Sequence, residues 1–354
     1  MVRIHKAPLH RRFRGCPLVY RIAAADAHRV STSRVGDLLL LAVAVVWGSS
    51  YLTAKTLVAA GGVLVLLALR FLISAVALLP ALAVRRSRGR FDRRELLVGV
   101  GLGVTQTSVL ILETFGLSMT SATNAGVLIS LTILMTPILE GFTRRRWLPP
   151  AFFGGAAAAT LGVVFLVAGP GLRTPSAGDA LMLAAAVVRA AHVTLSAHLT
   201  RGRSHDTATL AALQTLTGAV VCSTVAARAL PAAVAAYGPA QWAAVTYLAL
   251  GCSVFAFVVQ LWAIRRTSAS RASLLLGTEP VWAVLFGVAL AGDRLTPAAL
   301  LGIALVLAGT YYGQRLEGRS RAERSPTYAR GNDIVRRTPR PRVGARSVRR
   351  SRGI

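Results

Sequence analysis

Six ionisable side chains interrupt the long apolar stretches of this sequence, and they are the first candidates for chemistry. They are Lys55, Arg70, Glu113, Arg189, His192 and Glu279. A charged group at the centre of a lipid bilayer costs about 2.5–3.5 kcal/mol on insertion scales, so such groups normally face a protein interior or a cavity. All of them except Arg70 are therefore candidate substrate-binding or coupling residues, together with the polar Gln260 and the aromatic Trp47.

Glu113 places an acid inside an apolar segment, and Gln260 occupies the corresponding place 147 residues later. A carboxyl group in apolar surroundings can exchange protons near physiological pH, which is what a proton-coupled transporter needs. Two alternatives stay open. Glu113 could form a structural ion pair with Lys55 or Arg70, or it could lie shallow enough to reach water.

Arg189 and His192 are three residues apart and should share one face of a helix. Arg189 could bind a carboxylate or phosphate group of a substrate, and His192 could titrate near neutral pH. Alternatively, Arg189 neutralises Glu113 or Glu279. His192 could likewise donate to a backbone carbonyl. Trp47 precedes three small residues and could stack on a substrate, although small residues also serve close helix packing.

Pro137, Pro280 and Arg70 are predicted to have structural or gating roles. Pro280 leaves a carbonyl one turn earlier without its backbone donor, so with Glu279 it could form a hinge, or simply a fixed kink. Arg70 is expected to form an ion pair. Lys55 could instead reach the membrane interface through its long apolar stem.

The elements that must position these residues are predicted to be membrane-spanning helices. Of the 354 residues, 54% are hydrophobic and only 15% are charged, which is typical of membrane proteins and not of soluble domains. A spanning helix needs about 20 mostly apolar residues. The sequence offers ten such segments, at 38–58, 63–83, 96–117, 122–142, 149–169, 178–198, 208–229, 241–263, 268–291 and 297–314. The predicted fold class is an all-α integral membrane protein with ten transmembrane helices.

The basic residues predict the orientation of these helices. Of the 41 Lys and Arg residues, 35 lie in the tails and in alternate loops, at 1–37, 84–95, 143–148, 199–207, 264–271 and 315–354. Lys and Arg accumulate on the cytoplasmic side, so both termini are predicted to be cytoplasmic. The basic segments 1–36 and 315–354 are expected to be disordered, and the C-terminal one to lie on anionic lipid. Neither contains a folded module or interleaved aromatics that would indicate specific nucleic-acid binding.

Two internal similarities indicate a duplication. Asp37–Val46 matches Asp179–Val188 at seven of ten positions, and Thr120–Ala125 matches Thr267–Ala272 at four of six. The predicted units are 37–169 and 178–314, each with five helices. Because five is odd, the second unit must enter the membrane in the opposite sense, which gives the inverted repeat found in many secondary transporters.

Several short motifs occur in a recognisable order. They are Trp47-Gly-Ser-Ser50, Leu69-Arg-Phe71, Thr120-Ser-Ala-Thr-Asn-Ala125, Glu279-Pro280, Gly292-Asp-Arg-Leu295, and Leu301-Gly302 with Gly309. Over about residues 37–314 the chain resembles the EamA family of the drug/metabolite transporter superfamily. The resemblance implies ten helices in two inverted repeats, cytoplasmic termini and a substrate cavity between the halves. Members move amino acids, other metabolites or toxic compounds, often outward. Arg189 and His192 stand where the family commonly carries aromatics.

The predicted function is secondary active export of a small metabolite, amino acid or amphipathic compound by alternating access, with protons as the candidate coupling ion. The sequence contains no GxxxxGK[ST] motif, so ATP hydrolysis by this chain is not expected. Its three isolated cysteines indicate neither a disulfide framework nor a metal site, and no cofactor is predicted.

Two other functions are compatible with the sequence. One is a membrane scaffold or sensor that recruits partners through its basic tail. The other is a membrane enzyme acting on lipid-linked substrates, which a single histidine at bilayer depth, His192, supports poorly. The Arg- and Ala-rich composition suggests a bacterial inner-membrane protein.

Overall fold

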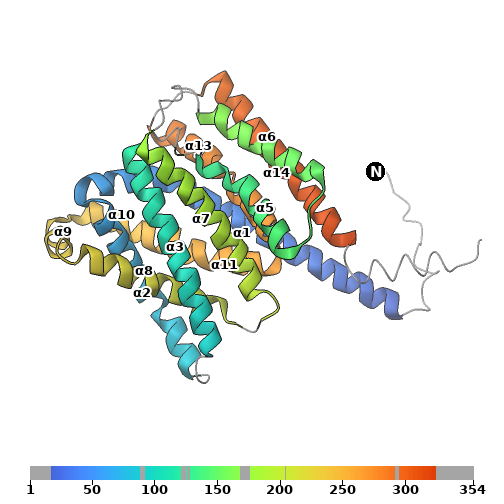
Figure 1. Cartoon of the computed structure of the whole chain (residues 1–354), viewed down its shortest axis with the longest axis horizontal. Coiled ribbons are helices and arrows are strands. Elements are labelled where there is room, and N and C mark those ends of the chain that lie inside the picture. Colours follow the sequence, from blue (N-terminus) through green and yellow to red (C-terminus); the bar gives the residue numbers. More distant parts are fainter. Residues whose placement is uncertain are drawn as a thin grey trace, which may run out of the picture.

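The computed structural model describes residues 17–87, 92–120, 125, 128–167, 176–203, 205–291 and 295–323. Within these ranges every regular element is a helix and no strand occurs (Figure 1). The all-α prediction is therefore confirmed. The predicted tail residues 1–16 and 324–354, most of the motif at 120–125, and residues 292–294 lie outside the described part of the chain.

Short breaks separate the helices along the chain. They are α1 (Pro17–Gly61), α2 (Val63–Ser87), α3 (Arg93–Met119), α5 (Thr132–Arg144), α6 (Pro150–Val167), α7 (Ala177–Thr200), α8 (Thr207–Ala226), α9 (Leu230–Ala236), α10 (Pro239–Ala249), the π-helix η2 (Leu250–Phe255), α11 (Ala256–Arg266), α12 (Ala269–Leu276), α13 (Glu279–Ala291) and α14 (Pro297–Glu323). Each apolar segment identified in the sequence overlaps at least one of these helices.

Among the described residues, six helical spans are long and apolar enough to cross a bilayer. They are Val63–Ser87, Arg93–Met119, Ala177–Thr200, Thr207–Ala226, Pro239–Arg266 and Ala269–Ala289. A seventh results if Arg34–Ser50 and Thr53–Gly61, which meet at 46°, count as one bent span. Large apolar side chains also cover the outside of the bundle: Leu97 is 72% exposed and Val76 64%. Such an apolar exterior fits lipid better than water.

Several element boundaries differ from the predicted ones. α1 already begins at Pro17, so residues 17–36 are helical, and the prediction of a disordered tail is wrong for them. α14 likewise continues to Glu323, past the predicted end at residue 314. In both places the helix extends beyond its apolar part, which hydropathy alone does not detect.

Polar caps fix several of the helix starts. Asp92 accepts the backbone N–H of Arg94 at the start of α3, and Asp206 accepts that of Thr209 at the start of α8. Ser176 and Asp179 form a capping box on α7. Each cap satisfies a backbone donor that the first helical turn leaves unpaired.

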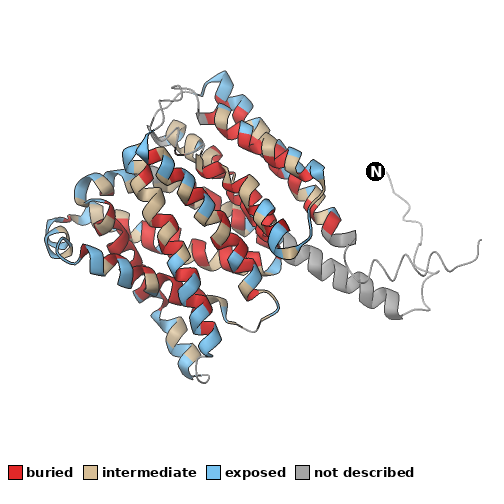
Figure 2. Cartoon of the chain, viewed as in Figure 1, coloured by how far each residue is buried: buried red, intermediate tan, exposed pale blue. Residues whose placement is uncertain are grey.

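Small residues allow the helices to approach one another closely, most clearly where α6 lies beside α14 (Figure 1). A Cβ atom added at Gly162 would lie 2.6 Å from the backbone nitrogen of Val306, and one at Gly302 would lie 2.5 Å from that of Leu166. Only glycine permits these contacts. The buried residues lie on the facing sides of the helices, and the exposed ones lie outside (Figure 2).

Candidate functional site

An arginine between two glutamates forms the centre of the candidate site. Nη2 of Arg189, on α7, lies 3.8 Å from Oε2 of Glu113, on α3. Nη1 of Arg189 lies 3.7 Å from Oε2 of Glu279, at the start of α13. The guanidinium carbon is 4.9 Å from the ring centroid of Trp47, on α1. Four of the predicted site residues, from four helices, therefore meet at one place, which we call the Arg189 cluster.

The cluster is largely shielded from solvent. The side chains of Arg189, Glu113 and Glu279 are only 16%, 14% and 7% exposed. Oε2 of Glu113 is buried and accepts no hydrogen bond from the described residues. At 3.8 Å its contact with Arg189 is longer than a hydrogen bond. This oxygen can therefore take a proton or a cationic group without first losing a hydrogen bond.

Arg70 and Trp47 converge on one backbone carbonyl, that of Cys252 in the π-helix η2. Nε1 of Trp47 donates to this oxygen at 2.9 Å and Nη2 of Arg70 at 3.1 Å. Nε of Arg70 also donates to Oγ of Ser253 at 2.6 Å. These contacts join α1 and α2 to η2, and single-turn π-helices are frequent at functional sites. Among the described residues, Arg70 thus forms hydrogen bonds to a carbonyl and a hydroxyl in place of the expected ion pair.

The charge of Arg70 nevertheless contributes to the Arg189 cluster, because it interacts electrostatically with both Glu113 and Arg189. Two arginines and two glutamates therefore balance one another when all four are ionised. One further proton, or one cationic group of a ligand, would give this buried set a net positive charge.

His192 contacts a hydroxyl and, as considered above, a backbone carbonyl, that of Leu102. Its Nδ1 lies 2.8 Å from Oγ1 of Thr105 on α3. The Thr105 hydroxyl lies 2.9 Å from the carbonyl of Leu102, which uses its single hydrogen. We therefore assign the donor role to Nδ1 of His192. The contact joins α7 to α3.

A small cavity of about 30 Å³ lies beside the Arg189 cluster. Arg189, Gln260 and Glu279 contribute polar groups to its wall, and Ile133 is among its apolar residues. The space suits about one or two water molecules and is far below the volume of a typical ligand pocket. The structure therefore represents a closed arrangement of the site.

The other predicted residues, Lys55, Pro280 and Pro137, are not part of the Arg189 cluster. Lys55 is exposed on α1, and Glu113 pairs with Arg189 instead. Pro280 is the second residue of α13, where its missing N–H removes no intrahelical bond. Glu279 thereby stands at a helix N-terminus, which favours its negative charge. Pro137 is buried inside α5.

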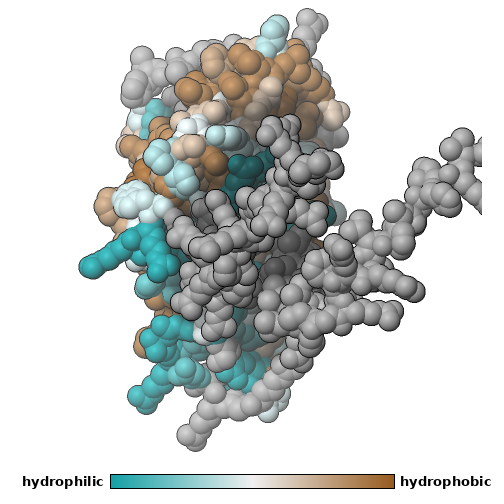
Figure 3. All heavy atoms as spheres, turned by 90° about the vertical axis from the view of Figure 1, so that its right-hand side faces the viewer, coloured by the Kyte–Doolittle hydropathy of each residue, from teal (hydrophilic) through white to brown (hydrophobic). Residues whose placement is uncertain are grey.

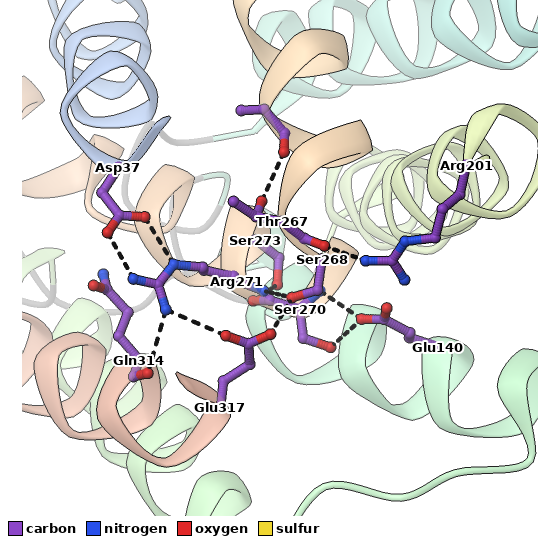
Figure 4. A network of polar contacts seen from close by, with 11 residues as sticks. Asp37, Glu140, Arg201, Thr267, Ser268, Ser270, Arg271, Ser273, Gln314 and Glu317 are labelled. Atoms are coloured by element: carbon purple, nitrogen blue, oxygen red, sulfur yellow. Dashed lines mark hydrogen bonds and ion pairs between the residues drawn. The ribbon is translucent and has the colours of Figure 1, made fainter. Parts of the chain in front are cut away.

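Sequence reasoning missed a second polar group, which lies at the end of the bundle where α7 terminates. We call this the Arg201 end, because Arg201 donates to the carbonyl of Thr267 there. Arg271 on α12 forms two hydrogen bonds to Asp37 on α1, at 2.7 and 2.6 Å, and one to Glu317 on α14, at 3.2 Å (Figure 4). We call these three residues the Asp37–Arg271 latch.

Neighbouring contacts reinforce the latch. Ser268 caps α12 and donates to Oε1 of Glu317 at 2.8 Å. Glu140 on α5 accepts the backbone N–H of Ser270 at 2.8 Å and its hydroxyl at 2.5 Å. The start of α12 is thus held by α1, α5 and α14. The signal was in the sequence, since Asp37 and Arg271 both lie in the repeated motifs.

The residue that aligns with Asp37 in the second repeat, Asp179, makes a contact between the repeats at the opposite end of α7. Its Oδ1 accepts a hydrogen bond from Oγ1 of Thr120, the residue that follows α3, at 2.5 Å. The backbone N–H of Ser176 donates to Oδ2 of Asp179 at 2.7 Å. The described residues contain no group of three or more His, Cys, Asp or Glu side chains placed to hold a metal ion.

Comparison with known proteins shows which family has this architecture. The EamA-like transporter family matches the chain twice, over residues 34–168 and 176–312. An uncharacterized transporter of Archaeoglobus fulgidus is 27% identical over 278 residues, covering 77% of this chain and 83% of the relative. A second uncharacterized transporter of the same organism is 24% identical over 282 residues, covering 77% and 95%.

A protein of known crystal structure has the same fold. It superposes with a TM-score of 0.66 at 21% identity, over 81% of this chain and 98% of its own. Together with the apolar helical spans, the two family matches identify a multi-pass membrane transporter, and the chain belongs to the EamA-like transporter family of the drug/metabolite transporter superfamily.

Proposed function

We propose that this transporter is a secondary active exporter of small metabolites or amphipathic compounds that carry a cationic group, with protons as the coupling ion. The observation that carries the proposal is the buried, hydrogen-bond-free oxygen of Glu113 beside an arginine that it shares with Glu279. Amino acids fit this description, since their carboxylate would pair with Arg189 and their ammonium group with Glu113.

Charge balance gives a reason for coupling. The set of Arg70, Arg189, Glu113 and Glu279 is neutral when fully ionised. A proton on Glu113 adds one positive charge, and so does a substrate ammonium group. A cationic substrate and the proton together would add two positive charges in a site of low dielectric constant, which is unfavourable. A zwitterionic amino acid adds no net charge, but its ammonium group needs the negative charge that a protonated Glu113 no longer offers. Proton and substrate therefore occupy the site in turn, as an antiporter requires.

The membrane arrangement in this proposal is ten helices in two inverted five-helix repeats, with the Arg201 end and both termini in the cytoplasm of a bacterial inner membrane. The positions of the aligned residues Asp37 and Asp179 support the inversion. Asp37 contacts Arg271 at the Arg201 end, whereas Asp179 lies at the start of α7, at its far end. The Arg189 cluster takes Trp47 and Glu113 from the first repeat and Arg189 and Glu279 from the second.

Alternating access needs contacts between the repeats that break in turn. The Asp37–Arg271 latch joins α1 of the first repeat to α12 and α14 of the second. The Asp179–Thr120 contact joins the repeats at the opposite end. We assign the closing of the cytoplasmic side to the latch.

The test is transport by the full chain in liposomes that contain a pH-sensitive dye. Radiolabelled amino acids and the cation ethidium serve as probes, and the transported probe is then used throughout. Wild-type protein should move protons opposite to the probe. Glu113→Gln should abolish that proton movement, whereas Asp92→Asn, at the exposed start of the same helix, should not. Unchanged coupling in Glu113→Gln would contradict the proposal.

A further inference from the structure

We propose that a second cavity, at the Arg201 end, binds a phosphate group carried by an anionic phospholipid. The cavity has a volume of about 330 Å³, far larger than the space beside the Arg189 cluster. It lies between the C-terminal ends of α5 and α7, the start of α12 and the last part of α14. The proposal is independent of which solute the protein moves.

The acids in the wall of this cavity are already occupied. Oε2 of Glu140 accepts two hydrogen bonds from Ser270, and Oε1 forms an ion pair with Nε of Arg144 at 3.1 Å without accepting a hydrogen bond within the described part of the chain. Glu317 accepts from Ser268 and pairs with Arg271. Arg144 compensates Glu140, whereas Arg271 is shared between Glu317 and Asp37, so these five groups carry a net charge of −1. Arg146 and Arg201, which also line the cavity, make the whole set positive.

The arginines of the wall, in contrast, retain unused donors. Arg146 is exposed and its side chain has no ion pair or hydrogen bond to the described residues. Arg201 uses one amino group for the carbonyl of Thr267 and keeps its remaining N–H groups. Arg146 and Arg201 come from different helix ends and both line the cavity, together with the hydroxyl-bearing Ser320. Convergent guanidinium donors are the usual protein ligands of a phosphate group.

The surroundings favour a lipid as the source of that phosphate. Phe142 and Trp147 flank the cavity wall at Gly141 and Arg146, are 66% and 48% exposed, and stack edge to face at 4.9 Å. Tyr311 and Tyr312, shortly before Glu317 on α14, are 57% and 51% exposed. Exposed aromatic residues of this kind gather at the headgroup level of a bilayer.

The hydropathy of this side of the molecule agrees with that placement. Where the described residues are visible, hydrophilic ones gather at the left and lower left, and hydrophobic ones form most of the upper part (Figure 3). Basic pockets between transmembrane helices on the cytoplasmic side are suited to anionic headgroups. In the membrane arrangement proposed above, the cavity has this position.

Native mass spectrometry of the full chain in detergent tests the proposal, with phosphatidylglycerol and phosphatidylcholine as probes and inorganic phosphate as a competitor. We expect tighter binding of phosphatidylglycerol than of phosphatidylcholine. The double variant Arg146→Gln, Arg201→Gln should weaken phosphatidylglycerol binding about 10- to 30-fold. The matched control Arg93→Gln, Arg94→Gln removes two exposed cations from the same end and should change it little.

Each outcome decides the proposal. The lipid site is supported if only the Arg146→Gln, Arg201→Gln variant loses phosphatidylglycerol binding. The proposal is overturned if the protein binds the two lipids equally, or if both double variants lose phosphatidylglycerol binding equally. Either result would mean that general surface charge, and not the cavity, attracts the lipid. Displacement by millimolar phosphate would assign the site to the free anion instead of the lipid. A thermal unfolding curve for each variant ensures that a lost signal reflects the site and not an unfolded chain.

Discussion

Breaking the Asp37–Arg271 latch should open the Arg201 end of the transporter. In Asp37→Asn the carboxylate that accepts two short hydrogen bonds from Arg271 becomes a neutral amide. A hydrogen bond to a charged group contributes about 1.5–3 kcal/mol. The side chains of Arg271 and Asp37 are 13% and 18% exposed, and Glu317 still pairs with Arg271, so the loss is reduced. We expect Asp37→Asn to destabilise the closed form by about 2 kcal/mol, which shifts the equilibrium about 30-fold toward the opened form.

Cysteine labelling measures this shift. Ile133 lines the small cavity beside the Arg189 cluster and is only 1% exposed, so a cysteine at this position reports access to the site. In a chain without its native cysteines, a membrane-impermeant maleimide is applied to either side of oriented vesicles. Asp37→Asn should speed labelling about 30-fold from the cytoplasmic side only.

A control at the same end is available in Asp206→Asn, which removes the carboxylate that caps α8 and does not touch the latch. It should leave the labelling rate within about twofold of the parent. The reasoning is refuted if Asp37→Asn labels no faster than the parent, or if its labelling rises equally from both sides of the membrane.

Two further predictions concern stability. Gly162→Ala places a Cβ atom 2.6 Å from a backbone nitrogen of α14 and should cost about 1–3 kcal/mol, seen as a lower thermal midpoint in detergent, whereas Gly154→Ala, with open space around it, should not be destabilised. Trp47→Phe keeps an aromatic ring over Arg189 but loses the N–H donor to Cys252. Because Arg70 still donates to that carbonyl, we expect a loss of only about 0.5–1.5 kcal/mol, and a larger loss would mean that Trp47 alone holds η2 in place.

The sequence predicted the helical fold, the duplication that the two family matches support, and all four members of the Arg189 cluster as site candidates. Hydropathy locates apolar helices, and charged residues within them stand out because burying them is costly. The pairing of Arg189 with both Glu113 and Glu279 was foreseen only as an alternative to substrate binding. Hydropathy does not report how each helix is rotated, and the rotation decides which polar side chains meet.

Because hydropathy does not report helix rotation, the Asp37–Arg271 latch was not predicted either. Asp37 and Arg271 are 234 residues apart, and each lies at an end of a predicted apolar segment, where a charge is unremarkable. Lys55 looked similar to Glu113 in the sequence, yet it lies on the exposed side of α1. The carbonyl of Cys252 became a shared acceptor only because the helix widens into a π-turn at this point. Backbone irregularities of this kind leave no periodic signal.

Proton release on substrate binding tests the central claim most directly. The purified transporter in weakly buffered detergent solution is mixed with the probe that it transports, and the pH change is recorded at a series of starting pH values. If substrate and proton compete for Glu113, wild-type protein should release up to about one proton per bound substrate. Glu113→Gln should bind the substrate with no release. Equal release from the wild type and from Glu113→Gln, or binding without release at every pH, would contradict the account.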